Sequence, residues 1–137
     1  MSDQPTTGAF PFLTYQDPAK AIEWLTEVFG FEAMNVTTTP DGSVMHAELR
    51  TQNGVVLLTP ADGGGVLPMR SPRDLPFTNQ GIYIHIAEAA DVDSHHDRAR
   101  AGGAAILLAL DTKPWGSREY TCTDLEGHIW SFGTYRP

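Results

Sequence analysis

The chain has 137 residues, of which 41% are hydrophobic and 19% are charged, and its formal net charge is -8 at pH 7. A chain of this length forms one domain, or two half-domains with a shared core, and buries enough surface to fold without disulfides or metals. The nine Lys and Arg residues are scattered along the sequence. Nucleic acid or an anionic membrane would need a basic face, so we expect neither partner.

The sequence gives few signals of location. No apolar run approaches the ~20 residues that a membrane span needs, and no basic segment precedes an apolar stretch at the N-terminus. The single cysteine, Cys122, has no partner for an internal disulfide, which is typical of a reducing compartment. We therefore expect a cytoplasmic protein.

The first part of the chain predicts a strand, a helix and three further strands. Residues 10–15 form the first strand, and Asp17 and Pro18 then provide a helix N-cap and a first-turn proline. Apolar residues recur at helical spacing up to Gly30, which ends the helix. Alternation and turn residues predict the strands that follow, at 31–38, 44–50 and 55–58.

The second part predicts the same order of elements. Residues 61–79 are rich in Gly and Pro without a period, and they are either a plain connector or a lid over a site. A strand at 81–86 and a helix at about 91–103 come next, then strands at 106–110, 118–123 and 128–134. We predict a single domain of residues 1–137, with module 1 at about 8–60, a linker at about 61–79 and module 2 at about 80–137.

The two parts are a low-similarity internal repeat of a βαβββ module. Superposing Gly54 on Gly127 predicts one constant offset through the last hairpin of each module, which places Leu49 on Cys122, Leu57 on Trp130 and Leu58 on Ser131.

Four segments carry a family resemblance: DPAKAIEWLTEVFGF, MHAELR, WGSREYTCTD and DLEGHIWSF. They resemble the vicinal oxygen chelate superfamily, which includes glyoxalase I, extradiol dioxygenases and bleomycin-resistance proteins, and most closely its PhnB-like branch. The resemblance implies an α+β fold in which two βαβββ modules form an open cup-like barrel, with helices outside and the ligand inside. It also implies a homodimer, since many members pair.

The resemblance also locates the usual metal ligands, one on the first strand and one on the last strand of each module. These positions are occupied here by Phe10, Leu58, Gly81 and Ser131. None of these side chains offers the imidazole or carboxylate that a divalent metal needs. We therefore expect no metal cofactor, the alternative being a divalent metal bound elsewhere.

Strand alternation predicts which side chains face into the cup, because the apolar faces should pack on the helices. Val56 and Leu58 are expected to face the cup together with Thr14, Thr121 and Ile129. Trp115, in a Pro-Trp-Gly turn at the rim, either stacks on a ligand or is structural. The predicted ligand-binding residues are Phe10, Phe12, His46, Glu48, Arg50, Tyr83, His85, Trp115, Glu119 and Ser131.

His46, Glu48 and His85 leave two interpretations open. They could form an unconventional metal site or a general base with its partner. Alternatively, they could be a polar network in which Arg50 pairs with Glu48. On the second helix, His95 and His96 point about 100° apart, so one should pack and the other face solvent.

These patterns favour a metal-independent small-molecule binding protein whose guest is aromatic or planar. Glu48 and Glu119 favour a cationic guest, and antibiotic resistance by sequestration is one use of such binding. The first alternative is a metal-dependent lyase, isomerase or dioxygenase that uses His46, Glu48 and His85. The second is a regulatory or dimerisation module without a ligand.

Overall fold

The computed structural model describes residues 8–61 and 65–137, and it contains the predicted repeat. Module 1 consists of β1 (Phe12–Tyr15), α1 (Pro18–Val28), β2 (Glu32–Thr38), β3 (Val44–Arg50) and β4 (Val55–Pro60). Module 2 consists of β5 (Gly81–His85), α3 (Ala89–Ala101), β6 (Ala105–Thr112), β7 (Arg118–Thr123) and β8 (Ile129–Gly133). The connecting segment contains a short 3-10 helix, η1 (Pro72–Asp74).

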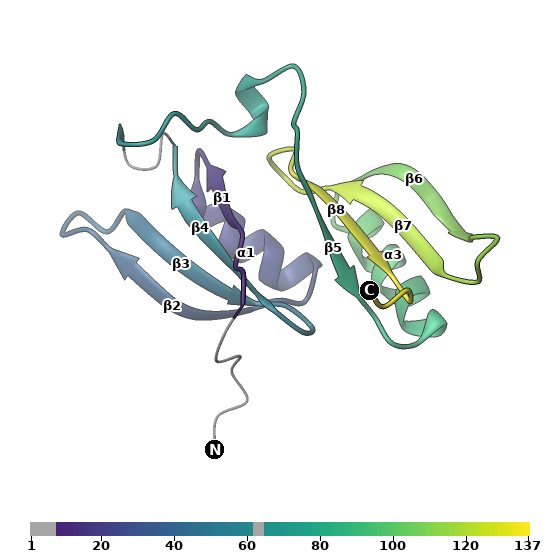
Figure 1. The fold of residues 1–137 in the computed structure, drawn as a ribbon. Coiled ribbons are helices and arrows are strands. Elements are labelled where there is room, and N and C mark those ends of the chain that lie inside the picture. Colours follow the sequence, from purple (N-terminus) through teal and green to yellow (C-terminus); the bar gives the residue numbers. More distant parts are fainter. Residues whose placement is uncertain (1–7, 62–64) are drawn as a thin grey trace.

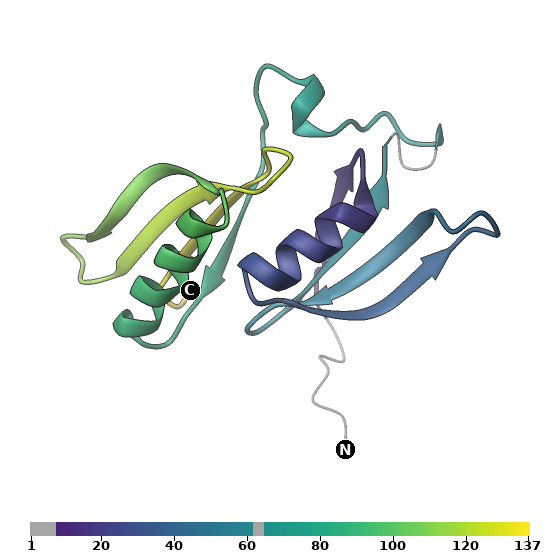
Figure 2. The same cartoon turned by 180° about the vertical axis from the view of Figure 1, so that it is seen from behind.

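Each module folds into a four-stranded mixed sheet. The strand orders are β1-β4-β3-β2 and β5-β8-β7-β6, with the first and last strands of each module parallel and the other pairs antiparallel. The sheets lie side by side with β1 and β5 at the edges that face each other (Figure 1). Seen from behind, α1 and α3 cover the same side of the molecule (Figure 2). The predicted α+β fold is confirmed, although across the described residues the two sheets do not close into a complete barrel.

Helix α1 forms where the sequence predicts it. The Asp17 carboxylate accepts a hydrogen bond from the Lys20 amide at 3.1 Å, and Pro18 occupies the first turn. Gly30 follows the helix with a φ of +76°, a backbone conformation that favours glycine. Ala21 and Leu25 are buried against the sheet. No helix within residues 8–61 and 65–137 has the length and apolar character needed to cross a membrane.

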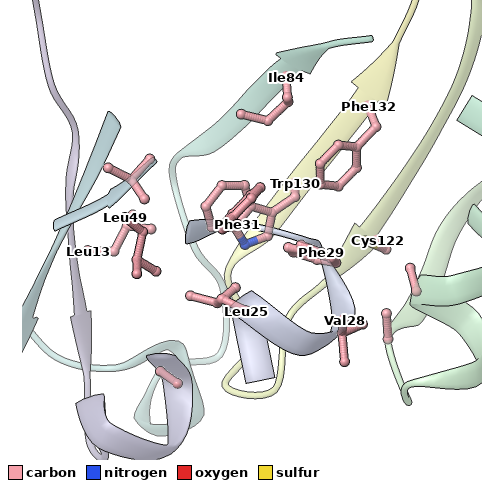
Figure 3. Packing of buried hydrophobic residues seen from close by; sticks show 14 of the residues in the cluster. Leu13, Leu25, Val28, Phe29, Phe31, Leu49, Ile84, Cys122, Trp130 and Phe132 are labelled. Atoms are coloured by element: carbon pink, nitrogen blue, oxygen red, sulfur yellow. The ribbon is translucent and has the colours of Figure 1, made fainter. Parts of the chain in front are cut away.

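The two modules share a core at the end of α1. The Phe29 ring lies 5.6 Å from the Trp130 ring and 5.0 Å from the Phe132 ring, measured between centroids, and Phe31 also packs on Trp130 (Figure 3). These contacts join the helix face of module 1 to strand β8 of module 2. Gly102 allows a close approach here, since a Cβ at this position would lie 2.6 Å from the Val28 side chain.

His95 links the modules through hydrogen bonds. Its Nε2 donates to the Phe29 carbonyl at 3.0 Å, and its Nδ1 lies 2.6 Å from the Tyr120 hydroxyl. Burial lowers the pKa of His95 to about 4, so the ring is neutral near pH 7. One member of the pair packs, as expected, and the structure shows that it is His95. His96 is less solvated than predicted, because its side chain is only 14% exposed and its ring lies edge-on to Tyr120.

Two buried carboxylates in the turn between β7 and β8 tie distant segments together. Asp124 accepts hydrogen bonds from the Tyr15 hydroxyl at 2.6 Å and from the Trp130 indole at 3.0 Å. Glu126 accepts from the Ser71 hydroxyl at 2.6 Å and from the Gln16 and Asp17 amides. This turn therefore fixes the connecting segment and the start of α1 to module 2. Burial and the neighbouring Asp124 raise the pKa of Tyr15 well above its usual value.

The register of β4 corrects the prediction for Val56 and Leu58. Both side chains face the helix side and are buried, at 2% and 0% exposed, rather than facing the cup. The loop at 51–54 is one residue shorter than the loop at 124–128, so the predicted offset fails after the hairpin turn. Leu57, not Leu58, therefore matches Ser131, and Val56 matches Trp130.

Candidate functional site

The open face of module 1 combines an apolar row with polar side chains. Strand pairing places Phe12 opposite Leu57 and Leu57 opposite Glu48, so these three side chains share the face away from α1. Phe12 is 46% exposed. His46 lies on the same face, with its Nε2 3.7 Å from a Glu48 carboxylate oxygen. This part of the predicted ligand-binding set is brought together as expected.

Glu48 is positioned by a residue that the sequence reasoning missed. The Asn35 amide donates a hydrogen bond to Glu48 Oε1 at 2.9 Å. Asn35 lies in an irregularity of the β2–β3 pairing, between Ala33 and Val36, which simple alternation does not locate. The result is a carboxylate held in place on the open face.

The expected pairing of Arg50 with Glu48 is wrong. Arg50 instead lies 3.7 Å from Glu32, because the β2–β3 register puts Glu32 directly opposite it. The Glu48 carboxylate is instead contacted by Asn35 and His46. No arginine therefore neutralises Glu48 within the part of the chain that the structure describes.

The open face of module 2 presents hydroxyl groups. Ser131 lies opposite both Tyr83 and Thr121, and its Oγ is 2.7 Å from the Thr121 hydroxyl. The Tyr83 hydroxyl donates to the Tyr135 carbonyl at 2.5 Å, and His85 Nδ1 lies 3.2 Å from the same oxygen. The polar atoms of this face are largely satisfied by the protein itself.

Glu119 lies beside Tyr83 on the same face. A Cβ at Gly133 would lie 2.6 Å from the Glu119 side chain and 3.0 Å from the Tyr83 hydroxyl, so glycine makes room for both groups. Partial burial and the Glu119 charge raise the pKa of Tyr83. Tyr83 is therefore a neutral hydrogen-bond donor near pH 7.

The proposed trio of His46, Glu48 and His85 does not assemble within one chain. His46 and Glu48 belong to β3 of module 1, whereas His85 ends β5 of module 2 and contacts Tyr135. Among the residues that the structure describes, no three His, Cys, Asp or Glu side chains are grouped so as to hold a metal ion.

The positions that the resemblance assigns to a metal do not fit one. Leu58 is buried, and the residue of β4 on the open face is Leu57, which lies opposite Phe12. In module 2, Ser131 lies opposite Tyr83. Phe10 precedes β1, and Gly81 lies opposite Ile129. These residues offer aromatic, aliphatic and hydroxyl groups but no imidazole or carboxylate, which are the usual ligands of divalent transition metals.

Some predicted site residues meet at the seam between the modules. Phe10 and Tyr83 line a cleft of about 310 Å³ together with Asn53, whose amide donates to the His85 carbonyl. Trp115 lies apart from this cleft, 67% exposed in the turn between β6 and β7. Its role as a stacking residue stays a prediction.

Two further residues have structural contacts. His128 lies 2.8 Å from the Thr14 carbonyl and packs against the Tyr15 ring. Cys122 is fully buried, and burial raises its pKa to about 12, so its thiol is not a ready nucleophile near pH 7.

Comparison with known proteins identifies the family. Residues 8–132 match the model of the Glyoxalase/Bleomycin resistance protein/Dioxygenase superfamily. The chain belongs to this superfamily. Two relatives, the uncharacterised proteins Mb0911c of Mycobacterium bovis and Rv0887c of Mycobacterium tuberculosis, are each 32% identical over 126 residues. The matches cover 90% of this chain and 80% and 71% of those relatives.

Solved structures agree with this assignment. TioX from Micromonospora sp. ML1 is 32% identical with a TM-score of 0.74, and the match covers 96% of this chain and 98% of TioX. FosX from Listeria monocytogenes, a fosfomycin resistance protein solved with Mn(II), has a TM-score of 0.70 at 16% identity over 97% and 93% of the two chains. At that identity the likeness to FosX shows the fold alone.

Proposed function

We propose that this superfamily member is a metal-independent small-molecule binding protein whose guest is planar or aromatic and carries a positive charge. The observation that supports this most is the pairing of Phe12 with Leu57 and of Tyr83 with Ser131. Aromatic and aliphatic groups at these positions favour apolar contact with a guest, at about 25 cal/mol per Å² buried. We also place the chain in the PhnB-like branch, on the strength of the segments WGSREYTCTD and DLEGHIWSF.

The charge of the two open faces supports a cationic guest. Glu48 is held by Asn35 on module 1, and Glu119 lies beside Tyr83 on module 2. Carboxylates attract a cation more strongly where water is partly excluded. The net charge of -8 also favours the approach of cations over anions.

A homodimer would complete the binding site. In one chain the two sheets lie side by side, with both helices behind them (Figure 1). Large apolar residues such as Phe12 and Leu108 are partly exposed. A second copy that laid its module 2 face over the module 1 face of the first would cover them and enclose a guest between two sheets. We propose this arrangement in the cytoplasm, with sequestration of an antibiotic as one use.

Calorimetric titration with planar aromatic cations and with cationic glycopeptide antibiotics tests the proposal. We expect saturable binding with quenching of tryptophan fluorescence, unchanged by a chelator. Glu48→Gln should weaken binding about tenfold through loss of one charge contact. The matched control is Glu23→Gln, which removes an exposed carboxylate from α1 on the other side of the sheet and should bind like the wild type.

Two outcomes would replace this proposal. Near-stoichiometric Ni, Zn, Mn or Fe after purification without chelator, lost in His46→Ala, would favour a metal-dependent lyase, isomerase or dioxygenase. Absence of both metal and guest binding, with a dimer in solution, would favour a regulatory or dimerisation module.

A further inference from the structure

A second cavity lies beneath the connecting segment, away from the polar groups of the open faces. It has a volume of about 400 Å³, in the range of small-molecule pockets at roughly 300–1,000 Å³. Its walls come from β1, from β5, from the start of β8 and from residues 68–80 of the connecting segment. The modules and the segment that joins them therefore all border this partly open space.

Most of the wall is apolar. Phe12 and Ile129 contribute from the sheets, and Met69, Leu75 and Phe77 contribute from the connecting segment. Leu75 and Phe77 are 43% and 85% exposed, so their side chains are available to a bound molecule. An apolar molecule of moderate size would bury this surface and gain about 25 cal/mol of binding free energy per Å² of apolar area.

The charge of the cavity is opposite to that of the protein as a whole. Arg70 is its one permanently charged lining residue within residues 8–61 and 65–137, and no Asp or Glu of those ranges lines it. Thr78, Asn79 and Gln80 add uncharged hydrogen-bonding groups. The protein's net charge is -8. A cavity with a lone guanidinium and no carboxylate nevertheless favours an anion locally.

Arg70 also differs from most other arginines of the chain. Arg73 and Arg118 contact carboxylates, and Arg98 donates to the Glu27 carbonyl. Arg70 is exposed, and its side chain makes no hydrogen bond or ion pair with any residue that the structure describes. A guanidinium at an apolar cavity is suited to a carboxylate or sulfonate, which it binds through two parallel hydrogen bonds.

We propose that this cavity is a second binding site, which takes a flat aromatic molecule with one carboxylate or sulfonate group. The aromatic body lies among Phe12, Phe77 and Ile129, and the anionic group pairs with Arg70. The site shares Phe12 with the cationic-guest site but not its polar groups, because Glu48, Glu119 and Ser131 do not line it. Its ligand bridges both modules and the connecting segment.

Fluorescence titration of the full-length protein with anilinonaphthalene sulfonate tests the site, with N-phenylnaphthylamine as the uncharged analogue. We expect one saturable anion site, with binding weakened about tenfold or more in Arg70→Gln and largely restored in Arg70→Lys. The uncharged analogue should bind both variants equally. Arg100→Gln is the matched control, because Arg100 is an exposed arginine of α3 outside the cavity.

Amide NMR shifts locate the probe. Shifts at Arg70, Gly81 and His128 that disappear in Arg70→Gln and persist in Glu48→Gln support the proposal. The proposal is overturned if Arg70→Gln binds the anion as tightly as Arg100→Gln, if the uncharged analogue loses the same factor, or if the shifts centre on Glu48 and Ser131. The Glu48→Gln arm also distinguishes this site from the cationic-guest site, since Arg70 lines only this cavity and Glu48 lies outside it.

Discussion

The open faces of module 1 and module 2 have the same backbone order but different chemistry. Where the last strand meets the first, module 1 pairs Leu57 with Phe12, whereas module 2 pairs Ser131 with Tyr83. The first pair is apolar, and the second is made of hydroxyl groups. The comparison teaches that the duplicated backbone sets where side chains point, while the residue at each position determines what the face can bind.

The largest effect should come from a charge placed on the buried side of β4, with the same change on its open side as the comparison. Leu58 faces the buried core and Leu57 faces the open side. Leu58→Glu buries an unpaired carboxylate and should lower the free energy of unfolding by about 3–5 kcal/mol or prevent folding. Leu57→Glu should fold with a much smaller loss. Urea unfolding measures both, and equal losses would show that the register of β4 is wrong.

The next effect concerns the shared core. Trp130 is fully buried against Phe29 and Phe31. Trp130→Ala should lower the free energy of unfolding by about 3–5 kcal/mol, because it leaves a cavity between the modules. The exposed Leu107→Ala is the control and should change stability little. A loss below about 1 kcal/mol in Trp130→Ala would mean that the modules do not share this core.

Stability should fall as the pH falls from about 6.5 to about 4. Burial lowers the pKa of His95 in the folded state to about 4 from a usual value of 6.5, so over this range the unfolded chain binds the proton more readily. Over this range the free energy of unfolding should fall by about 3 kcal/mol, and above the pKa of the unfolded chain His95 should cause no loss. Unfolding curves at several pH values should show this slope in His96→Gln and a flatter one in His95→Gln. An unchanged slope in His95→Gln would assign the effect to another group.

A smaller effect should follow from loosening the connecting segment. Ser71 is buried and donates to Glu126 at 2.6 Å. Ser71→Ala should cost about 1–2 kcal/mol and increase amide hydrogen exchange in residues 68–80. Ser94→Ala removes a hydroxyl that bonds only within α3 and should change neither quantity. Unchanged exchange in Ser71→Ala would mean that Glu126 does not hold the segment.

Local sequence patterns predicted most of the fold, because they report which face of an element is apolar. The alternation through Ala47 and Leu49, and through Ile84 and Ile86, gave the correct buried faces. The apolar run at 55–58 does not alternate, so the predicted direction of its side chains depended on the length of the preceding loop. That loop is one residue shorter in module 1 than in module 2, which reverses the side of the sheet on which each residue of the run lies.

The candidate site was harder to predict, because its polar contacts join residues that are distant in the sequence or lie at irregular positions. Asn35 reaches Glu48 from a bulged strand, and Arg50 pairs across the sheet with Glu32. The contacts of Asp124 and Glu126 with the start of module 1 connect opposite ends of the chain. No local pattern marks such partners before the topology is known.

Metal analysis combined with guest titration tests the central claim most directly. The protein should be purified without chelator, its metal content measured, and binding of a planar aromatic cation followed by calorimetry before and after chelator treatment. A metal-independent binding protein predicts far less than one ion per chain and the same affinity in both titrations. A near-stoichiometric divalent metal, whose removal abolishes binding, would contradict the account.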